Sequence, residues 1–105
     1  MSYVHVVTVG ASLASRYESE RAGGRVTEAE INEKLSKMHE AELARYIKEL
    51  TNFIQKKEGE GKLSEVSAEI NALSRFLKEI SLVYLIHSDT NIGRCCARAL
   101  KDYLS

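Results

Sequence analysis

The sequence predicts an α/β fold, a Rossmann-like parallel sheet with two visible strands and a long helical hairpin inserted after the first strand. Two β-branched runs, Tyr3–Val9 and Ser81–His87, are apolar on both faces, as strands buried in parallel sheets are. The long segment between them carries apolar residues mostly at helical spacing, and a further amphipathic segment, Asn91–Leu104, follows the second run. The predicted order is strand, helical hairpin, strand, helix.

The first strand closes at Gly10, and residues 10–26, rich in Gly, Ser and Arg, are predicted to form a loop with a flexible turn at Gly23-Gly24. Thr27 then begins a helix, because Thr27 and Glu30 have the spacing of a capping box. The helix ends at Gly59-Glu-Gly61. Its apolar stripe consists of Ile31, Leu35, Met38, Tyr46, Ile47, Leu50 and Ile54.

A second helix is predicted over Ser64–Glu79, and a turn with capping residues, Ser88-Asp89-Thr90, precedes the last helix. The stripe of the second helix indicates core or a helix partner rather than a cofactor site; it consists of Leu63, Val66, Ile70, Leu73, Leu77 and Ile80. The buried face predicted for the last helix consists of Ile92, Cys95, Cys96, Ala99, Leu100 and Tyr103.

Composition narrows the class of function. Fifteen basic residues balance fifteen acidic ones, which argues against binding long nucleic acid but leaves room for a small phosphorylated ligand. No apolar run of about 18 residues predicts a membrane span, and the N-terminus lacks the pattern of a signal peptide. The adjacent Cys95 and Cys96 read as buried free thiols of a cytoplasmic protein. Neither they nor His5 and His39 have metal-site spacing, so no metal or cofactor is expected.

Two strands alone make at best a marginal sheet. We therefore expect residues 1–105 to be a single domain that is incomplete, the N-terminal β-α-α-β-α portion of a longer fold, or to complete its sheet through a partner. A homodimer is the expected assembly.

Ligands of parallel α/β sheets bind at the carboxyl ends of the strands. After the first strand, Gly10 permits a tight turn, and the Ser12 hydroxyl is suited to a phosphate or ribose oxygen. The alternative interpretation is a plain strand-ending turn. After the second strand, the start of the last helix suits an anion, with Gly93 allowing close approach and Arg94 supplying a guanidinium fork.

Other residues near the second loop have two interpretations each. Asp89 and Thr90 either cap the last helix or contact a ligand. His87 is either a structural histidine or a general acid.

Together these loops resemble a known family. Residues 4–13 (VHVVTVGASL) resemble the opening strand and loop of CRISPR-associated Rossmann-fold (CARF) domains of type III CRISPR systems, and residues 85–90 (LIHSDT) with Gly93 resemble their second motif. The resemblance implies a dimer that binds cyclic oligoadenylate, chiefly cyclic tetra-adenylate, across its two-fold axis in antiviral defence. Some relatives are ring nucleases, in which a ribose 2′-hydroxyl of the ligand attacks the adjacent phosphate without a metal.

The resemblance places Gly10, Ala11 and Ser12 around a phosphate, with Ser12 the catalytic candidate. It also places Ser88, Asp89, Thr90 and Gly93 at the border of the second half of the site. Arg16 and Arg94 complete the predicted ligand-binding set. Many relatives have threonine in place of Ala11, asparagine near Arg16, and further strands with a functional lysine.

Two other functions stay open at this point. One is a nucleotide-binding module for another ligand, and the other is a structural module whose helical hairpin docks a partner. Whether the ring is cleaved or only sensed, which ring size is preferred, and whether an effector domain follows Ser105 are also open.

Overall fold

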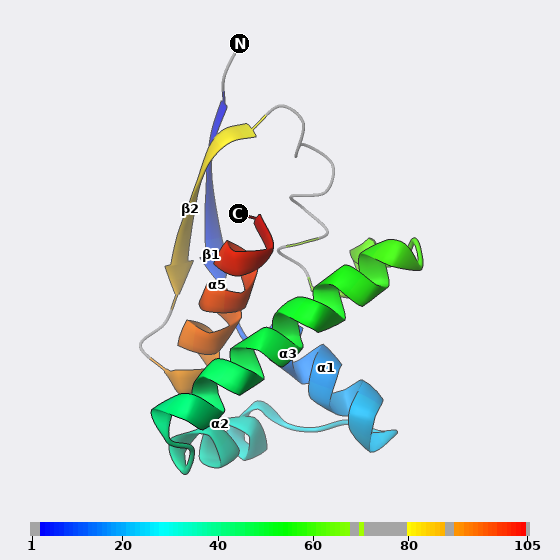
Figure 1. Ribbon diagram of the computed structural model, residues 1–105, viewed down its shortest axis with the longest axis vertical. Helices are drawn as coiled ribbons and strands as arrows, with labels where there is room; N and C mark the ends of the chain where they lie inside the picture. Colours follow the sequence, from blue (N-terminus) through cyan, green and yellow to red (C-terminus); the bar gives the residue numbers. More distant parts are fainter. Residues whose placement is uncertain (1–2, 68–69, 71–79, 88–89, 105) are drawn as a thin grey trace.

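The computed structural model describes residues 3–67, 70, 80–87 and 90–104 (Figure 1). In chain order the described elements are β1 (Tyr3–Val9), α1 (Ser12–Ala22), α2 (Glu28–Ser36), α3 (Glu40–Gly59), the 3-10 turn η1 (Leu63–Glu65), β2 (Ile80–His87) and α5 (Asn91–Leu104). None of the helices in these ranges is long and apolar enough to cross a membrane.

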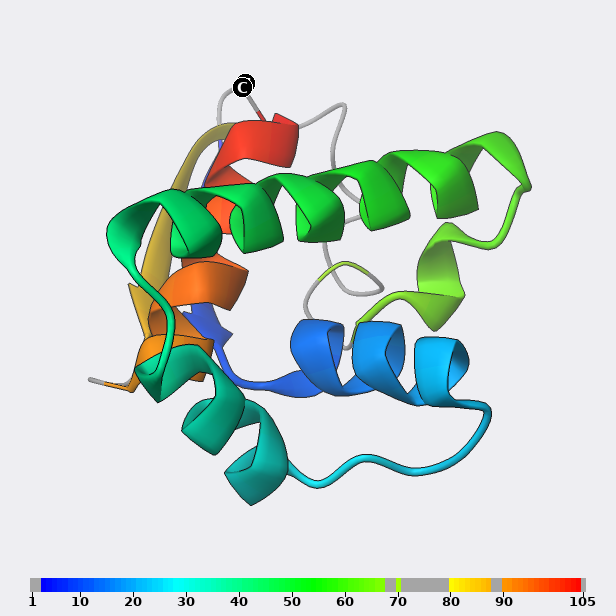
Figure 2. The same ribbon diagram turned by 60° about the horizontal axis from the view of Figure 1, so that its bottom comes forward.

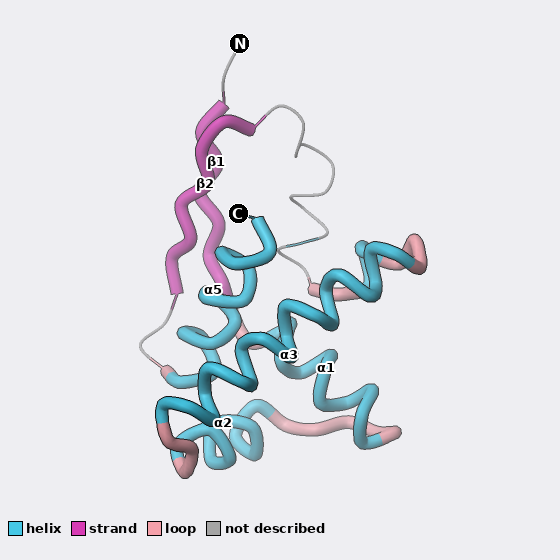
Figure 3. The backbone as a smooth tube through the Cα atoms, in the orientation of Figure 1, coloured by secondary structure: helices cyan, strands magenta, loops and turns pink. Residues whose placement is uncertain are grey.

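The two strands pair in parallel and stand at one side of the molecule (Figure 3). Val9 pairs with His87, so both strands end at the same edge. Helix α5 lies between the strand pair and α3 (Figures 1 and 2). Val9 is buried whereas Val6 is 57% exposed. These two residues lie on opposite faces of β1, and Val9 belongs to the core that the strand shares with the helices.

The predicted fold class is wrong. The described chain is mainly helical, and its two strands form a single pair, so no Rossmann-like sheet is built within the described residues. The physical reason lies in residues 12–59, which form three successive helices and bury most of their apolar side chains against one another and α5. The strands themselves were placed correctly at Tyr3–Val9 and, to within one residue, at Ile80–His87.

The predicted loop at residues 10–26 is also wrong, because most of it is helix α1. This helix has few apolar residues, and only Leu13 and Ala14 among them are fully buried, so it lacks the stripe that marks a helix in sequence. Gly23, predicted to be a turn inside a loop, ends the helix in the left-handed conformation with a φ of 73°.

The single helix predicted from Thr27 is two helices. Thr27 caps α2 as predicted, since its Oγ1 accepts a hydrogen bond from the Glu30 amide at 3.2 Å. The chain then turns after Ser36, and α3 begins beyond His39, whose backbone amide donates to the Glu42 carboxylate at 3.3 Å. The predicted glycine break is confirmed, because α3 ends at Gly59 and Gly61 has a φ of 73°.

The core lies where α1, α2, α3 and α5 meet. It contains the predicted stripe residues Ile31, Leu35, Tyr46, Leu50 and Ile54, together with Val66, Ile70, Ile92, Cys95, Cys96, Ala99 and Leu100. Both cysteines are buried and unbridged, as predicted. Most of the helix predicted at residues 64–79 and two residues of the predicted turn, Ser88 and Asp89, lie outside the described residues.

Candidate ligand groove

The first predicted loop follows the paired strand ends. Gly10 is exposed, Ala11 precedes α1, and the half-buried Ser12 is the first residue of α1. Ala11 gives α1 no side-chain cap. Among the described residues, positive φ occurs at Gly23 and Gly61, so the turn at Gly10 is made without the left-handed conformation. Gly10 therefore follows directly on Val9, the residue that pairs with His87 at the end of β2.

Backbone amides at the start of α5 donate hydrogen bonds to side-chain oxygen atoms of the chain itself. Thr90 Oγ1 accepts a hydrogen bond from the Gly93 amide at 3.0 Å, so the capping interpretation of Thr90 holds in this structure. Asn32 Oδ1, on α2, accepts one from the Ile92 amide at 3.1 Å. Two amides that a phosphate would use at a helix start are thus already bonded. Gly93 is buried in this turn.

The two predicted arginines have different surroundings. Arg16 pairs with two carboxylates, Glu20 at 3.2 Å and Glu65 at 3.7 Å, on the exposed side of α1. Arg94 donates through its Nη2 to the Asn91 Oδ1 at 3.4 Å and lines a groove that begins at His87. Arg94 therefore belongs to a concave surface, and Arg16 is engaged elsewhere.

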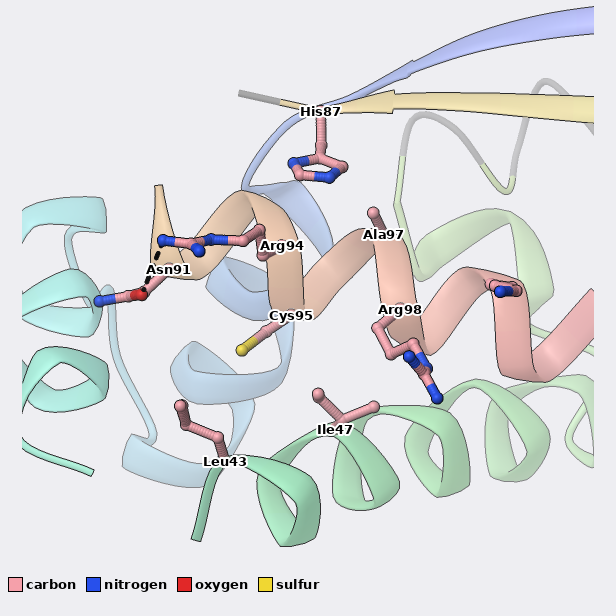
Figure 4. Close-up of a pocket in the computed structure, with 9 residues that line it drawn as sticks. Leu43, Ile47, His87, Asn91, Arg94, Cys95, Ala97 and Arg98 are labelled. Carbon is pink, nitrogen blue, oxygen red and sulfur yellow. Dashed lines mark hydrogen bonds between the residues drawn. The ribbon is translucent and has the colours of Figure 1, made fainter. Parts of the chain in front are cut away.

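That groove, the α3–α5 groove, has a volume of about 500 Å³. His87 at the end of β2 points toward α5, while Cys95 of α5 faces Leu43 and Ile47 of α3 across the groove (Figure 4). The lining residues are Leu43, Ile47, His87, Asn91, Arg94, Cys95, Ala97, Arg98 and Lys101. Its volume falls within the range of about 300–1,000 Å³ usual for small-molecule sites.

The electrostatic character of the α3–α5 groove is cationic. Arg94, Arg98 and Lys101 follow one another at steps of four and three residues, which places them along one face of α5. None of the residues named as its lining is acidic. Carboxylates do stand beside it: Asp102 Oδ1 lies 3.5 Å from Arg98 Nε, and both Glu40 and Asp102 line an adjoining cleft that shares Leu43, Ile47 and Arg98 with the groove. Sequence reasoning missed Arg98 and Lys101, although their spacing from Arg94 was visible.

The apolar wall of the α3–α5 groove includes the Cys95 thiol, which is a weak nucleophile. Burial raises the pKa of the Cys95 thiol, with Arg94 opposing this shift, so the thiol is protonated at neutral pH and is a weak nucleophile. No group of three or more His, Cys, Asp or Glu side chains suited to a metal comes together within the described ranges. The arrangement is suited to binding an anion with an apolar body.

Comparison with known proteins gives one finding. Residues 64–105 match the model of a family described as CRISPR-associated protein (Cas_APE2256). No curated protein and no solved structure matches the chain. The matched segment contains β2 and α5, and thus His87 and all three cations of the α3–α5 groove. The match supports a CRISPR-associated protein.

Proposed function

We propose that this chain binds cyclic oligoadenylate, chiefly cyclic tetra-adenylate, in the α3–α5 groove and at the adjoining strand ends. One observation carries the proposal: three cations lie along one groove whose other described lining residues are not acidic, in the segment that matches a CRISPR-associated family. The resemblance of residues 4–13 and 85–90 to CARF motifs supplies the ligand class.

The chemistry of the α3–α5 groove fits such a ligand. Each phosphodiester of the ring carries one negative charge, and the Arg94 and Arg98 guanidinium groups are suited to hold it through two parallel hydrogen bonds. Leu43 and Ile47 offer an apolar wall to an adenine face. A chain of zero formal net charge, with three of its fifteen Lys and Arg residues along this groove, favours a small anion over long nucleic acid.

The size of the α3–α5 groove favours a dimer as the ligand-binding form. A ring of four nucleotides is larger than one groove of about 500 Å³. We therefore propose that two copies of the chain share one ring, each contributing Arg94 and Arg98. A two-fold dimer presents the same residues twice to a ligand with repeated phosphates.

The test is calorimetric titration of the purified chain with cyclic tetra-adenylate, with linear tetra-adenylate as a comparison ligand. Because a hydrogen bond to a charged group contributes about 1.5–3 kcal/mol and each substitution occurs twice in the dimer, Arg94→Ala or Arg98→Ala should weaken binding by at least roughly 150-fold. Arg45→Ala is the matched control, since this arginine of α3 lines a different cleft. It should leave the affinity unchanged.

Two outcomes would count against the proposal. Absence of binding by the unmodified chain would remove the ligand assignment. Binding that both groove variants leave intact would place the ligand elsewhere. Chromatography of the same samples reports whether the ring is opened, and Ser12→Ala then tests the catalytic assignment of the first residue of α1.

A further inference from the structure

The first turn of α5 is held by a residue from a distant part of the sequence. The Asn32 side chain on α2 accepts a hydrogen bond from the Ile92 amide at 3.1 Å, a contact between residues 60 positions apart. Asn32 is half-buried, and its neighbours Ile31 and Leu35 are each 1% exposed. Because the two apolar side chains anchor α2 in the core, the side-chain Oδ1 of Asn32 presents a fixed acceptor.

This contact bears directly on Arg94. The Arg94 amide donates to the Thr90 carbonyl at 3.0 Å, and its guanidinium donates to Asn91 at 3.4 Å, so the arginine is oriented by the same turn. Movement of Ile92 away from α2 would move Asn91 and Arg94 with it. Asn32 does not itself line the α3–α5 groove.

We propose that Asn32 is a positioning residue for the α3–α5 groove: it fixes the first turn of α5 against α2 and so holds Arg94 in place for an anionic ligand. This inference rests on the proposed function. The neutral amide suits the role, because an aspartate would accept the same hydrogen bond but would place a negative charge at the first turn of α5, which carries Arg94. The site then includes α2, which lies outside the segment that matches the CRISPR-associated family.

Hydrogen exchange of the chain without ligand tests whether Asn32 fixes the first turn of α5. Asn32→Ala should speed exchange of the Ile92 amide roughly 2- to 10-fold, the effect of losing one neutral hydrogen bond. Asn32→Asp should restore the protection, since its carboxylate is also an acceptor. Asn52→Ala, an exposed asparagine on α3, is the matched control and should leave this amide unchanged. Unchanged exchange in Asn32→Ala would overturn the inference.

Titration with cyclic tetra-adenylate tests the ligand half through a double-mutant cycle. Asn32→Ala should weaken binding about tenfold in the unmodified chain and much less when Arg94 is already alanine, because the effect passes through Arg94. Asn32→Asp should also bind the ring more weakly, because its negative charge opposes an anionic ligand, although it restores the protection of the Ile92 amide. An equal loss in both backgrounds would overturn the positioning role.

The failure of the proposed function is distinguishable from failure of this inference. If the unmodified chain binds no ring, the proposed function falls and the ligand-positioning role with it. Faster exchange of the Ile92 amide would then identify Asn32 as a contact that stabilises the start of α5 and nothing more.

Discussion

Two of the concave surfaces along α3 have charges that are organised in opposite ways. The α3–α5 groove has three cations, and none of its lining residues in the described ranges is acidic. The α1–α3 cleft, of about 430 Å³, is lined by Tyr17, Glu20, Arg21, Glu49, Asn52, Phe53 and Lys56. There the Tyr17 hydroxyl donates to Glu49 at 2.9 Å, and Glu49 lies 3.9 Å from Arg21. Ion pairs between helices hold them together, whereas a groove whose described charged lining residues are all basic is suited to an anion.

Beneath the α1–α3 cleft, a buried carboxylate joins three helices. Glu18 on α1 is 9% exposed and accepts hydrogen bonds from Lys34 on α2 at 3.1 Å and Tyr46 on α3 at 3.3 Å. Burial, and then the charge of Glu18, raise the pKa of the Tyr46 phenol, which therefore remains a donor. The α1–α3 side is thus the scaffold on which the α3–α5 groove is carried.

The largest expected effect is a loss of stability that leaves ligand affinity almost unchanged. Leu50 on α3 is fully buried, so Leu50→Ala should lower the free energy of unfolding by about 2–5 kcal/mol through lost apolar contact and a residual cavity. Urea denaturation measures it. At a temperature where the variant is still folded, its affinity for cyclic tetra-adenylate should be within about twofold of the unmodified chain.

Arg98→Ala is the reciprocal control for this comparison. Its exposed pair with Asp102 contributes little, so the free energy of unfolding should change by less than about 1 kcal/mol. A large loss of stability in Arg98→Ala would show that the groove cations are part of the scaffold, and the contrast between the two surfaces would fail.

The strands and the last helix could be predicted from sequence, because their local patterns are strong. A β-branched run ended by Gly10 and a capped amphipathic segment from Asn91 each specify one structure. The break between α2 and α3 has no glycine or proline to mark it. The apolar pattern holds a signal, since Leu43 follows Met38 by five positions, a step that does not continue one helical stripe.

The fold class required knowledge of how elements pack, which local pattern does not supply. Helix α1 is stabilised by contacts far away in sequence, such as Lys34 to Glu18 and Tyr46 to Glu18, so its own residues do not predict it. The same holds for the site. Arg94 was predicted from its loop, whereas Asn32 enters through a hydrogen bond that joins residues 60 apart.

A smaller effect is expected in the scaffold itself. Tyr46→Phe removes one donor to Glu18 and leaves Lys34 bonded to it, so stability should fall by about 1 kcal/mol. The phenylalanine fills nearly the same space, which excludes a cavity as the cause. Thermal unfolding measures the loss, and Tyr17→Phe, which removes a half-buried hydroxyl bonded to Glu49, is the matched control with a smaller expected loss. An unchanged melting temperature in Tyr46→Phe would remove this network from the stabilising contacts.

The smallest effect is a pH dependence of stability, where the C-terminal ends of α3 and α5 meet. Tyr103 on α5 donates a hydrogen bond to Glu58 on α3, and burial, followed by this bond, raises the pKa of Tyr103 to about 12. The unfolded phenol titrates near pH 10, so the unfolded state loses its proton first as the pH rises. The stability from this contact is therefore complete below pH 10 and is lost as the pH rises through about 12.

Comparison with Tyr103→Phe isolates this contribution, because alkaline losses elsewhere, including those at Tyr17 and Tyr46, are common to both proteins. The unmodified chain should be more stable than Tyr103→Phe at pH 8, by less than about 1 kcal/mol for a contact near solvent, and the difference should vanish by pH 12. Urea denaturation at each pH measures it. Parallel stability curves from pH 8 to 12 would mean that the Tyr103–Glu58 contact adds nothing to the packing of α5 on α3. The α3–α5 groove would then be held by its apolar wall and by the anchors at the start of α5 alone.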